Sequence, residues 1–133
     1  MNIGDKAHLT RTFNKKDIEM FVKISGDLNP IHSDDQYAEK TKFKGRIAPG
    51  LLVAGLISAV IANQLPGPGS IYLSQKLKFV KPVRVNDSIT AEVEVININK
   101  VNNRVTLFTR CFNKKMENVI IGEAEVLSPE IML

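Results

Sequence analysis

Residues 50–62 read G-L-L-V-A-G-L-I-S-A-V-I-A, an apolar run without a charged side chain. Pro49 stands before it, where the first turn of a helix tolerates a residue that lacks an N–H. The breaker sequence L-P-G-P-G follows at residues 65–69. The run therefore predicts a helix from about Gly50 to Gln64 that is apolar on all sides and lies covered at the centre of the fold. It is too short to span a membrane, which takes about 20 residues.

Alternating apolar and polar residues follow this helix, a pattern typical of strands that are half covered by a core. The alternation occupies residues 70–80, 88–98, 104–112 and 118–127, and a further short strand is expected at residues 6–13. Strands joined by short turns predict an antiparallel meander. The expected fold class is α+β, with an antiparallel sheet of about five strands wrapped around one central helix.

A shorter helix is predicted near the N-terminus, over residues 15–24. Asn14 precedes it and is suited to cap its first turn, since an asparagine side chain accepts hydrogen bonds from free backbone N–H groups. Gly26 follows it and is suited to the left-handed conformation that ends many helices.

The connection after this helix carries an acid and a histidine. D-L-N-P at residues 27–30 predicts a turn, because proline disfavours helix at the residue before it. S-D-D-Q at residues 33–36 matches a capping box, so its serine is expected to start a short helix to about Thr41. Asp27 and His32 therefore lie on a connection, where reacting side chains are commonly displayed.

The composition is that of a globular protein, expected to form one domain over residues 1–133. Hydrophobic residues make up 44% and charged residues 24%. The net charge of +4 is spread along the chain, so no nucleic-acid partner is predicted. Cys111 is the single cysteine, and with two histidines it gives no metal-ligand spacing. The polar N-terminus lacks the apolar core of a signal peptide, so a cytoplasmic location without membrane association is expected.

Asp27 and His32 allow two explanations. In the structural one, Asp27 accepts a hydrogen bond from the turn backbone and His32 caps the next helix. In the chemical one, both side chains converge on one water and together take and give protons. Gly50 begins the apolar helix nearby, and free N–H groups at a helix N-terminus stabilise a developing oxyanion. The combination favours proton chemistry beside a carbonyl.

Four segments also resemble a known family. S-G-D-L-N-P-I-H at residues 25–32 resembles the hydratase 2 motif of MaoC-like (R)-specific enoyl-CoA hydratases. Residues 46–52 (R-I-A-P-G-L-L), 65–72 (L-P-G-P-G-S-I-Y) and 79–87 (F-V-K-P-V-R-V-N-D) are similar to that family as well. The resemblance covers nearly the whole chain. It implies the hot-dog fold and the reversible hydration of a trans-2-enoyl-CoA to an (R)-3-hydroxyacyl-CoA, with no metal or redox cofactor.

Site residues follow from the resemblance. Asp27 and His32 correspond to the catalytic pair that binds the water, and the backbone N–H of Gly50 corresponds to the group that polarises the thioester carbonyl. Asn29 and Ser58 are expected at the substrate-binding site. Asn29 is expected to shape the turn there, and Ser58 lies near the acyl pocket or, equally well, serves close helix packing. The resemblance and the exposed strand edges both predict a homodimer.

The chain departs from the family at Pro49, where many members carry histidine. Since the chemistry at this point is assigned to the Gly50 backbone, the change is expected to tune the loop without abolishing activity. Candidates for contacts with the coenzyme A phosphates are Lys76, Lys78, Lys81 and Arg84, which are also ordinary solvated strand residues.

Three alternative functions remain open at this point. A dehydratase subunit of fatty-acid synthesis, acting on acyl-carrier-protein substrates, would share the catalytic pair. A hot-dog thioesterase would place its water on the thioester carbonyl, which the pairing of Asp27 with His32 does not favour. A non-catalytic acyl-CoA-binding subunit would not need either residue.

Overall fold

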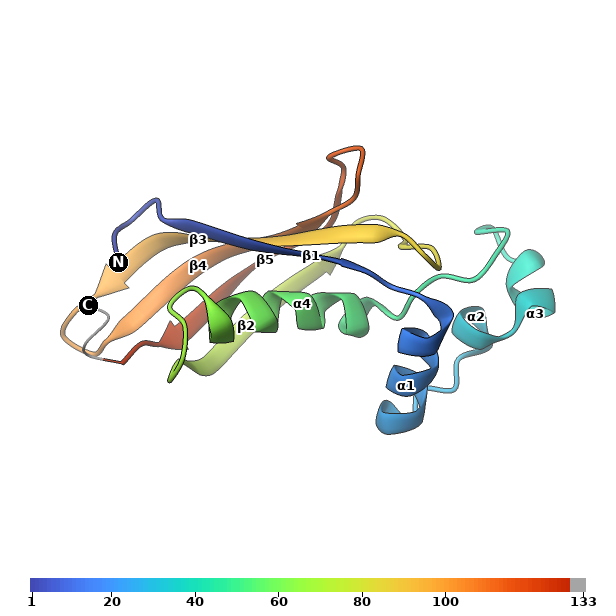
Figure 1. The fold of residues 1–133 in the computed structure, drawn as a ribbon, viewed down its shortest axis with the longest axis horizontal. Coiled ribbons are helices and arrows are strands. Elements are labelled where there is room, and N and C mark those ends of the chain that lie inside the picture. Colours follow the sequence, from blue (N-terminus) through green and yellow to red (C-terminus); the bar gives the residue numbers. More distant parts are fainter. Residues whose placement is uncertain (130–133) are drawn as a thin grey trace.

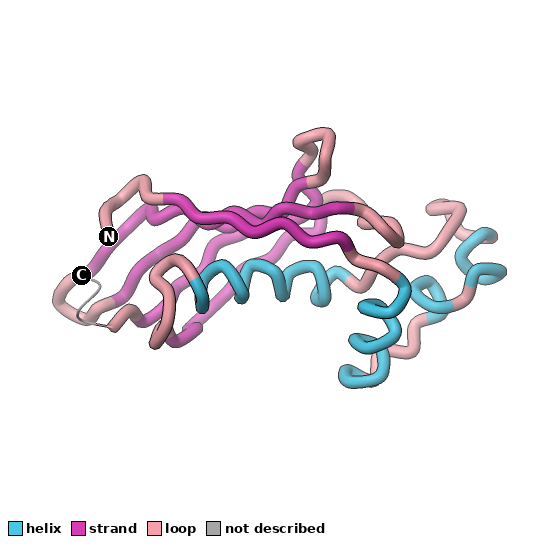
Figure 2. The backbone as a smooth tube through the Cα atoms, viewed as in Figure 1, coloured by secondary structure: helices cyan, strands magenta, loops and turns pink. Residues whose placement is uncertain are grey.

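The computed structural model describes residues 1–129, in which a curled antiparallel sheet holds one long helix against its inner face (Figures 1 and 2). The elements are β1 (Lys6–Thr12), α1 (Lys15–Ser25), α2 (Pro30–Ser33), α3 (Asp35–Glu39), α4 (Gly50–Asn63), β2 (Ile71–Phe79), β3 (Ser88–Asn99), β4 (Arg104–Phe112) and β5 (Asn118–Leu127). The predicted α+β class and the five strands are confirmed. Residues 130–133 of the expected domain lie outside the described residues.

The order of the strands differs from the predicted meander. The sheet runs β1-β3-β4-β5-β2, so only β3, β4 and β5 are neighbours in sequence order. Strand β2 pairs with β5 at the far edge. The reason is the segment 80–87, which leaves the sheet and packs against the entry to α4. There Ala48 N–H donates to the Val83 carbonyl at 2.7 Å, and the chain then reaches the opposite side of the sheet to begin β3 beside β1.

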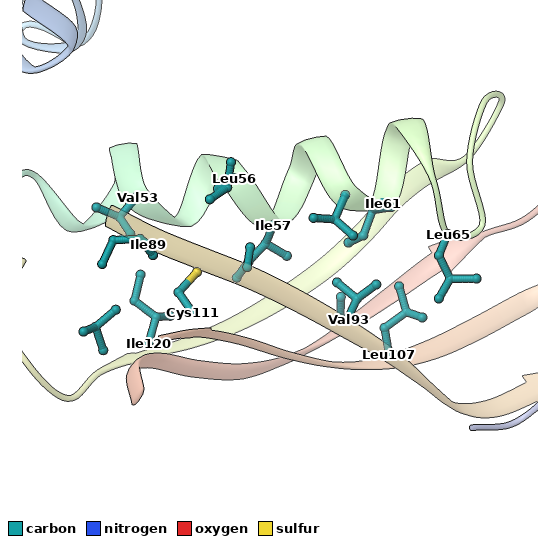
Figure 3. Close-up of a cluster of buried hydrophobic side chains, with 14 of the residues drawn as sticks. Val53, Leu56, Ile57, Ile61, Leu65, Ile89, Val93, Leu107, Cys111 and Ile120 are labelled. Carbon is teal, nitrogen blue, oxygen red and sulfur yellow. The ribbon is translucent and has the colours of Figure 1, made fainter. Parts of the chain in front are cut away.

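The core lies between α4 and the concave face of the sheet (Figure 3). Val53, Ile57 and Val60 of α4 are fully buried there, against residues such as Val93 and Leu107 of the strands. Burial of each such side chain stabilises the fold by about 1.5–3 kcal/mol. This packing confirms the helix as the central element.

The prediction that α4 is covered all round is wrong for the single chain. One sheet covers one side of the helix, and Leu51 on the opposite side remains 63% exposed. Gly55, Ser58 and Ala62 lie on the same uncovered side. Helix α4 has 14 residues, and within residues 1–129 no helix is long and apolar enough to cross a membrane.

The first helix forms as its sequence predicts. The Asn14 side chain accepts from the Asp17 N–H at 2.9 Å, and the Asp17 carboxylate accepts from the Asn14 N–H at 3.1 Å. These two bonds make a capping box in which Asp17 takes the place usually held by glutamate. Gly26 ends the helix in the left-handed conformation, with φ of 77°.

The capping box expected at Ser33 is wrong. Asp34 caps α3 instead, because its carboxylate accepts from the Tyr37 N–H at 3.1 Å. Ser33 is the last residue of α2, a helical turn that Pro30 begins. The short helix ends at Glu39, two residues before the expected end at Thr41.

Gly122→Ala is expected to lower the free energy of unfolding by about 3 kcal/mol, because overpacking against backbone forces strands apart. A Cβ at Gly122 would lie 1.9 Å from the Lys76 carbonyl oxygen of β2. Urea unfolding would measure the loss. Gly55→Ala is the matched control, since a Cβ there meets nothing within 4 Å and alanine favours helix. Equal stability of the two variants would contradict the close contact of β2 with β5.

The Cys111 thiol is expected to be unreactive in the folded protein. It is fully buried in the core, and burial raises its pKa to about 12. Because the thiolate is the reactive form, alkylation at pH 8 requires unfolding. A colorimetric thiol reagent should therefore detect about one equivalent in denaturant and almost none in buffer, with one thiol per chain. Rapid reaction in buffer would show that the core opens locally.

Candidate active site

Asp27 and His32 are brought together by the turn between α1 and α2. The Asp27 Oδ1 atom accepts from the Asn29 N–H at 3.1 Å, and the Asn29 side chain accepts from the Ile31 N–H at 3.2 Å. These bonds fold the chain back on itself just after α1. As a result the Asp27 Oδ2 atom lies 3.6 Å from His32 Nε2.

The imidazole of His32 is held by the chain that leads into α4. Its Nδ1 atom lies 2.8 Å from the carbonyl oxygen of Ile47, and the side chain is 10% exposed. Since a carbonyl only accepts hydrogen bonds, Nδ1 carries the proton of the neutral ring. Nε2 is then an acceptor, and it faces the Asp27 carboxylate.

This arrangement suits a shared water. The two facing atoms, Nε2 and Oδ2, are too far apart for a direct hydrogen bond at 3.6 Å, but both fall within reach of one oxygen between them. A water held there would donate one hydrogen to the His32 ring and the other to the Asp27 carboxylate. Its oxygen lone pairs would then be free to attack a substrate, with a proton acceptor already in contact.

The third group of the site is the N-terminus of α4. Gly50 is the first helical residue, and Pro49 provides no side-chain cap. Within residues 1–129 no hydrogen-bond acceptor is found for the Gly50 N–H. A free amide at the positive end of a helix dipole is placed to bind a developing oxyanion.

Asp27, His32 and Gly50 line one cavity of about 510 Å³. This is within the range of small-molecule sites, about 300–1,000 Å³. Most of its other walls are apolar, and Lys42 and Lys81 supply positive charge. The apolar walls include Phe43, Ile47, Leu51, Val53, Phe79, Val80, Val83 and Ile120. Apolar walls with a few converging polar groups are typical of substrate sites.

Asn29 and Ser58 are not brought to this cavity. The Asn29 side chain is used to cap α2, so it shapes the turn. Ser58 lies two turns beyond Gly50 on α4 and lines a separate cavity of about 300 Å³ between α4 and β2. Pro49 does line the cavity that contains Asp27 and His32, beside Gly50.

Of the four residues predicted to contact the coenzyme A phosphates, one lines the cavity of Asp27 and His32 and the other three do not. Lys81 lines the cavity and forms an ion pair with Glu117. Lys76 and Lys78 of β2 line a separate surface hollow with Phe108 of β4, and Arg84 donates to the Gly45 carbonyl. Within residues 1–129 no cluster of three metal-ligating side chains is found.

Several cavity residues were not predicted from the sequence, among them Lys42 and Phe79. Lys42 comes from the connection before α4, and Phe79 is the last residue of the edge strand β2. Neither lies in a local pattern with Asp27 and His32. The position of Phe79 depends on where β2 joins the sheet, for which the sequence holds no local signal.

Comparison with known proteins identifies the family. Residues 2–112 match the MaoC like domain family. The chain belongs to this family. Its sequence is 46% identical over 126 residues to the (R)-specific enoyl-CoA hydratase of Rhodospirillum rubrum, over 95% of this chain and 87% of that protein.

Two further members of the MaoC-like family bear on fold and activity. The structure of an (R)-hydratase from Aeromonas caviae involved in PHA biosynthesis superposes with a TM-score of 0.94 at 41% identity, over 97% of this chain and 98% of that chain. The hot-dog fold is thereby confirmed. A mitochondrial 3-hydroxyacyl-acyl-carrier-protein dehydratase of Arabidopsis thaliana is 34% identical over 134 residues, covering 98% of this chain and 80% of that protein.

Proposed function

We propose that this chain is an (R)-specific enoyl-CoA hydratase, a hydro-lyase that reversibly adds water to a trans-2-enoyl-CoA. The observation that carries the proposal is that Asp27, His32 and Gly50 line one cavity. Proton acceptors and an oxyanion donor around one space are what addition to a conjugated thioester requires. The activities named for the Rhodospirillum and Aeromonas relatives support the (R) configuration of the product.

The proposed mechanism assigns a role to each group. The Gly50 N–H binds the thioester oxygen, and Asp27 and His32 hold the water against the β-carbon. As the water oxygen attacks, one of the pair accepts its proton, and the electrons of the double bond move to the thioester oxygen. The pair then returns a proton to the α-carbon on the same face. One OH and one H are added, so the reaction uses no oxidant or reductant.

Acyl-carrier-protein thioesters are the second candidate substrates. The Arabidopsis relative is named for that carrier, and the reacting part of the molecule is the same with either carrier. Lys42 and Lys81 at the cavity suit the phosphates of both. Rates on crotonyl-CoA and on a crotonyl carrier protein, measured side by side, decide between them.

A homodimer is proposed from the free edge of the sheet. Strand β2 has a neighbour on one side only, and its first part exposes Ile71, Tyr72 and Leu73. An apolar edge with unpaired backbone groups favours pairing with a second copy. Light scattering should give twice the chain mass of 14.8 kDa, and a stable monomer would contradict the proposal.

The activity is tested by mixing the purified protein with crotonyl-CoA and following the loss of enoyl-thioester absorbance. Rapid loss with formation of (R)-3-hydroxybutyryl-CoA is expected. Release of free thiol would indicate a thioesterase instead. No reaction with either the CoA or the carrier-protein thioester would overturn the proposal.

A further inference from the structure

Gly50 has a second feature besides its free N–H, which is the absence of a side chain. The aromatic ring of Phe79 lies directly against its Cα. A Cβ at position 50 would lie 2.5 Å from Phe79 Cε1 and 2.7 Å from Cδ1. These distances are shorter than any ordinary contact between carbon atoms, which begins near 3.5 Å. Only glycine at position 50 leaves room for the ring where it is.

Backbone conformation does not account for this glycine. Gly50 is the first residue of a regular helix, where alanine would be the more stable choice. Gly50 does not have the left-handed φ that several other glycines of residues 1–129 adopt. The space that the Phe79 ring occupies is therefore the feature that requires glycine.

Phe79 is held at the site by its backbone but its ring is not part of the core. It pairs with Ile120 of β5, and the next residue, Val80, donates its N–H to the Val119 carbonyl at 2.9 Å. Its side chain is nevertheless 51% exposed and lines the cavity with Asp27 and His32. An aromatic ring that a strand carries beside Asp27 and His32 and that is left half uncovered has a free face for a ligand.

We propose that Phe79 is a positioning residue that presses the substrate's thioester group against the Gly50 N–H and excludes water from that hydrogen bond. The inference rests on the proposed hydratase function. A hydrogen bond to a developing enolate is stronger when water is kept away from it, and small displacements of the reacting group slow the reaction strongly. Phe79 and Gly50 therefore act as a matched pair, ring against bare Cα.

The test makes the side chain at position 79 smaller and the one at position 50 larger, singly and together, and measures kcat and KM on crotonyl-CoA. Phe79→Leu is expected to lower kcat about tenfold with a smaller change in KM, since it weakens an interaction made mainly in the transition state. Gly50→Ala is expected to lower kcat about a hundredfold, because the added methyl displaces the ring and the carbonyl. Combining Gly50→Ala with Phe79→Leu should recover about tenfold of that loss, since the shorter side chain leaves room for the methyl.

Phe108→Leu is the matched control, because Phe108 is also a partly exposed strand phenylalanine but lies outside the catalytic cavity. Its kcat should equal that of the parent, and thermal unfolding of each variant reports whether it is folded. The proposal is overturned if Gly50→Ala costs the same with and without Phe79→Leu, or if Phe79→Leu leaves kcat unchanged.

A parent protein without hydratase activity would disprove the proposed function. The contact of Phe79 with a bound thioester would then be tested separately. Binding of butyryl-CoA, a saturated thioester that does not react, would then be measured by calorimetry. Phe79→Leu should weaken its binding about threefold relative to Phe108→Leu, the smaller effect expected when an aromatic contact with an unreactive ligand is lost. Equal affinities of the two variants would overturn the role of Phe79.

Discussion

Asp27→Asn is expected to lower kcat for crotonyl-CoA hydration about a thousandfold, within the usual range for loss of an acid–base group. The change keeps the side-chain oxygen that accepts from the Asn29 N–H, so the turn should retain its shape. It removes the negative charge 3.6 Å from His32 Nε2 and replaces one acceptor of the water with an amide. Initial rates and a far-ultraviolet circular dichroism spectrum measure the two effects separately.

Asp34→Asn is the matched control for this variant. The Asp34 carboxylate also accepts a hydrogen bond from a backbone N–H, that of Tyr37, at 3.1 Å, but Asp34 does not line the cavity of Asp27 and His32. It should therefore keep the activity of the parent. If Asp27→Asn retained activity while folded, Asp27 would serve the turn alone, which is the structural explanation that the sequence left open.

The helices and strands could be predicted from the sequence because their signals are local. The period-two pattern places β4 at Arg104–Phe112 and β5 at Asn118–Leu127, as the structure has them. The order of the strands is not local, so the neighbour of β2 was predicted wrongly. A register shift between Tyr72 and Ser74 also breaks the alternation within β2, and Tyr72 turns to the inner side opposite Val126.

Only the parts of the site that lie on one turn, Asp27 and His32, and at one helix start, Gly50, could be predicted from the sequence. Asp27 and His32 are five residues apart, so a single turn brings them close, and the Ile47 carbonyl then orients the His32 ring. Phe79 meets Gly50 across 29 positions of sequence, through the pairing of β2 with β5. Ser58 was expected near the acyl pocket from the resemblance, but it faces a different cavity of the single chain.

His32→Asn is expected to lower kcat on crotonyl-CoA by about a thousandfold, again the range for loss of a proton-transfer group. An asparagine amide can take the place of Nδ1–H and donate to the Ile47 carbonyl, which now lies 2.8 Å from the ring. The contact that orients the residue is therefore kept, while Nε2 is lost. Rate measurements at saturating crotonyl-CoA isolate kcat from any change in binding.

His8→Asn provides the control, since His8 is exposed on β1 and should not affect the rate. The double variant Asp27→Asn/His32→Asn gives the sharper result. In the proposed mechanism both groups hold the same water, so the second substitution should cost far less than the first, and the double variant should be about as slow as either single one. Losses that multiply would instead mean that Asp27 and His32 act in separate steps on separate atoms, and the shared water would have to be abandoned.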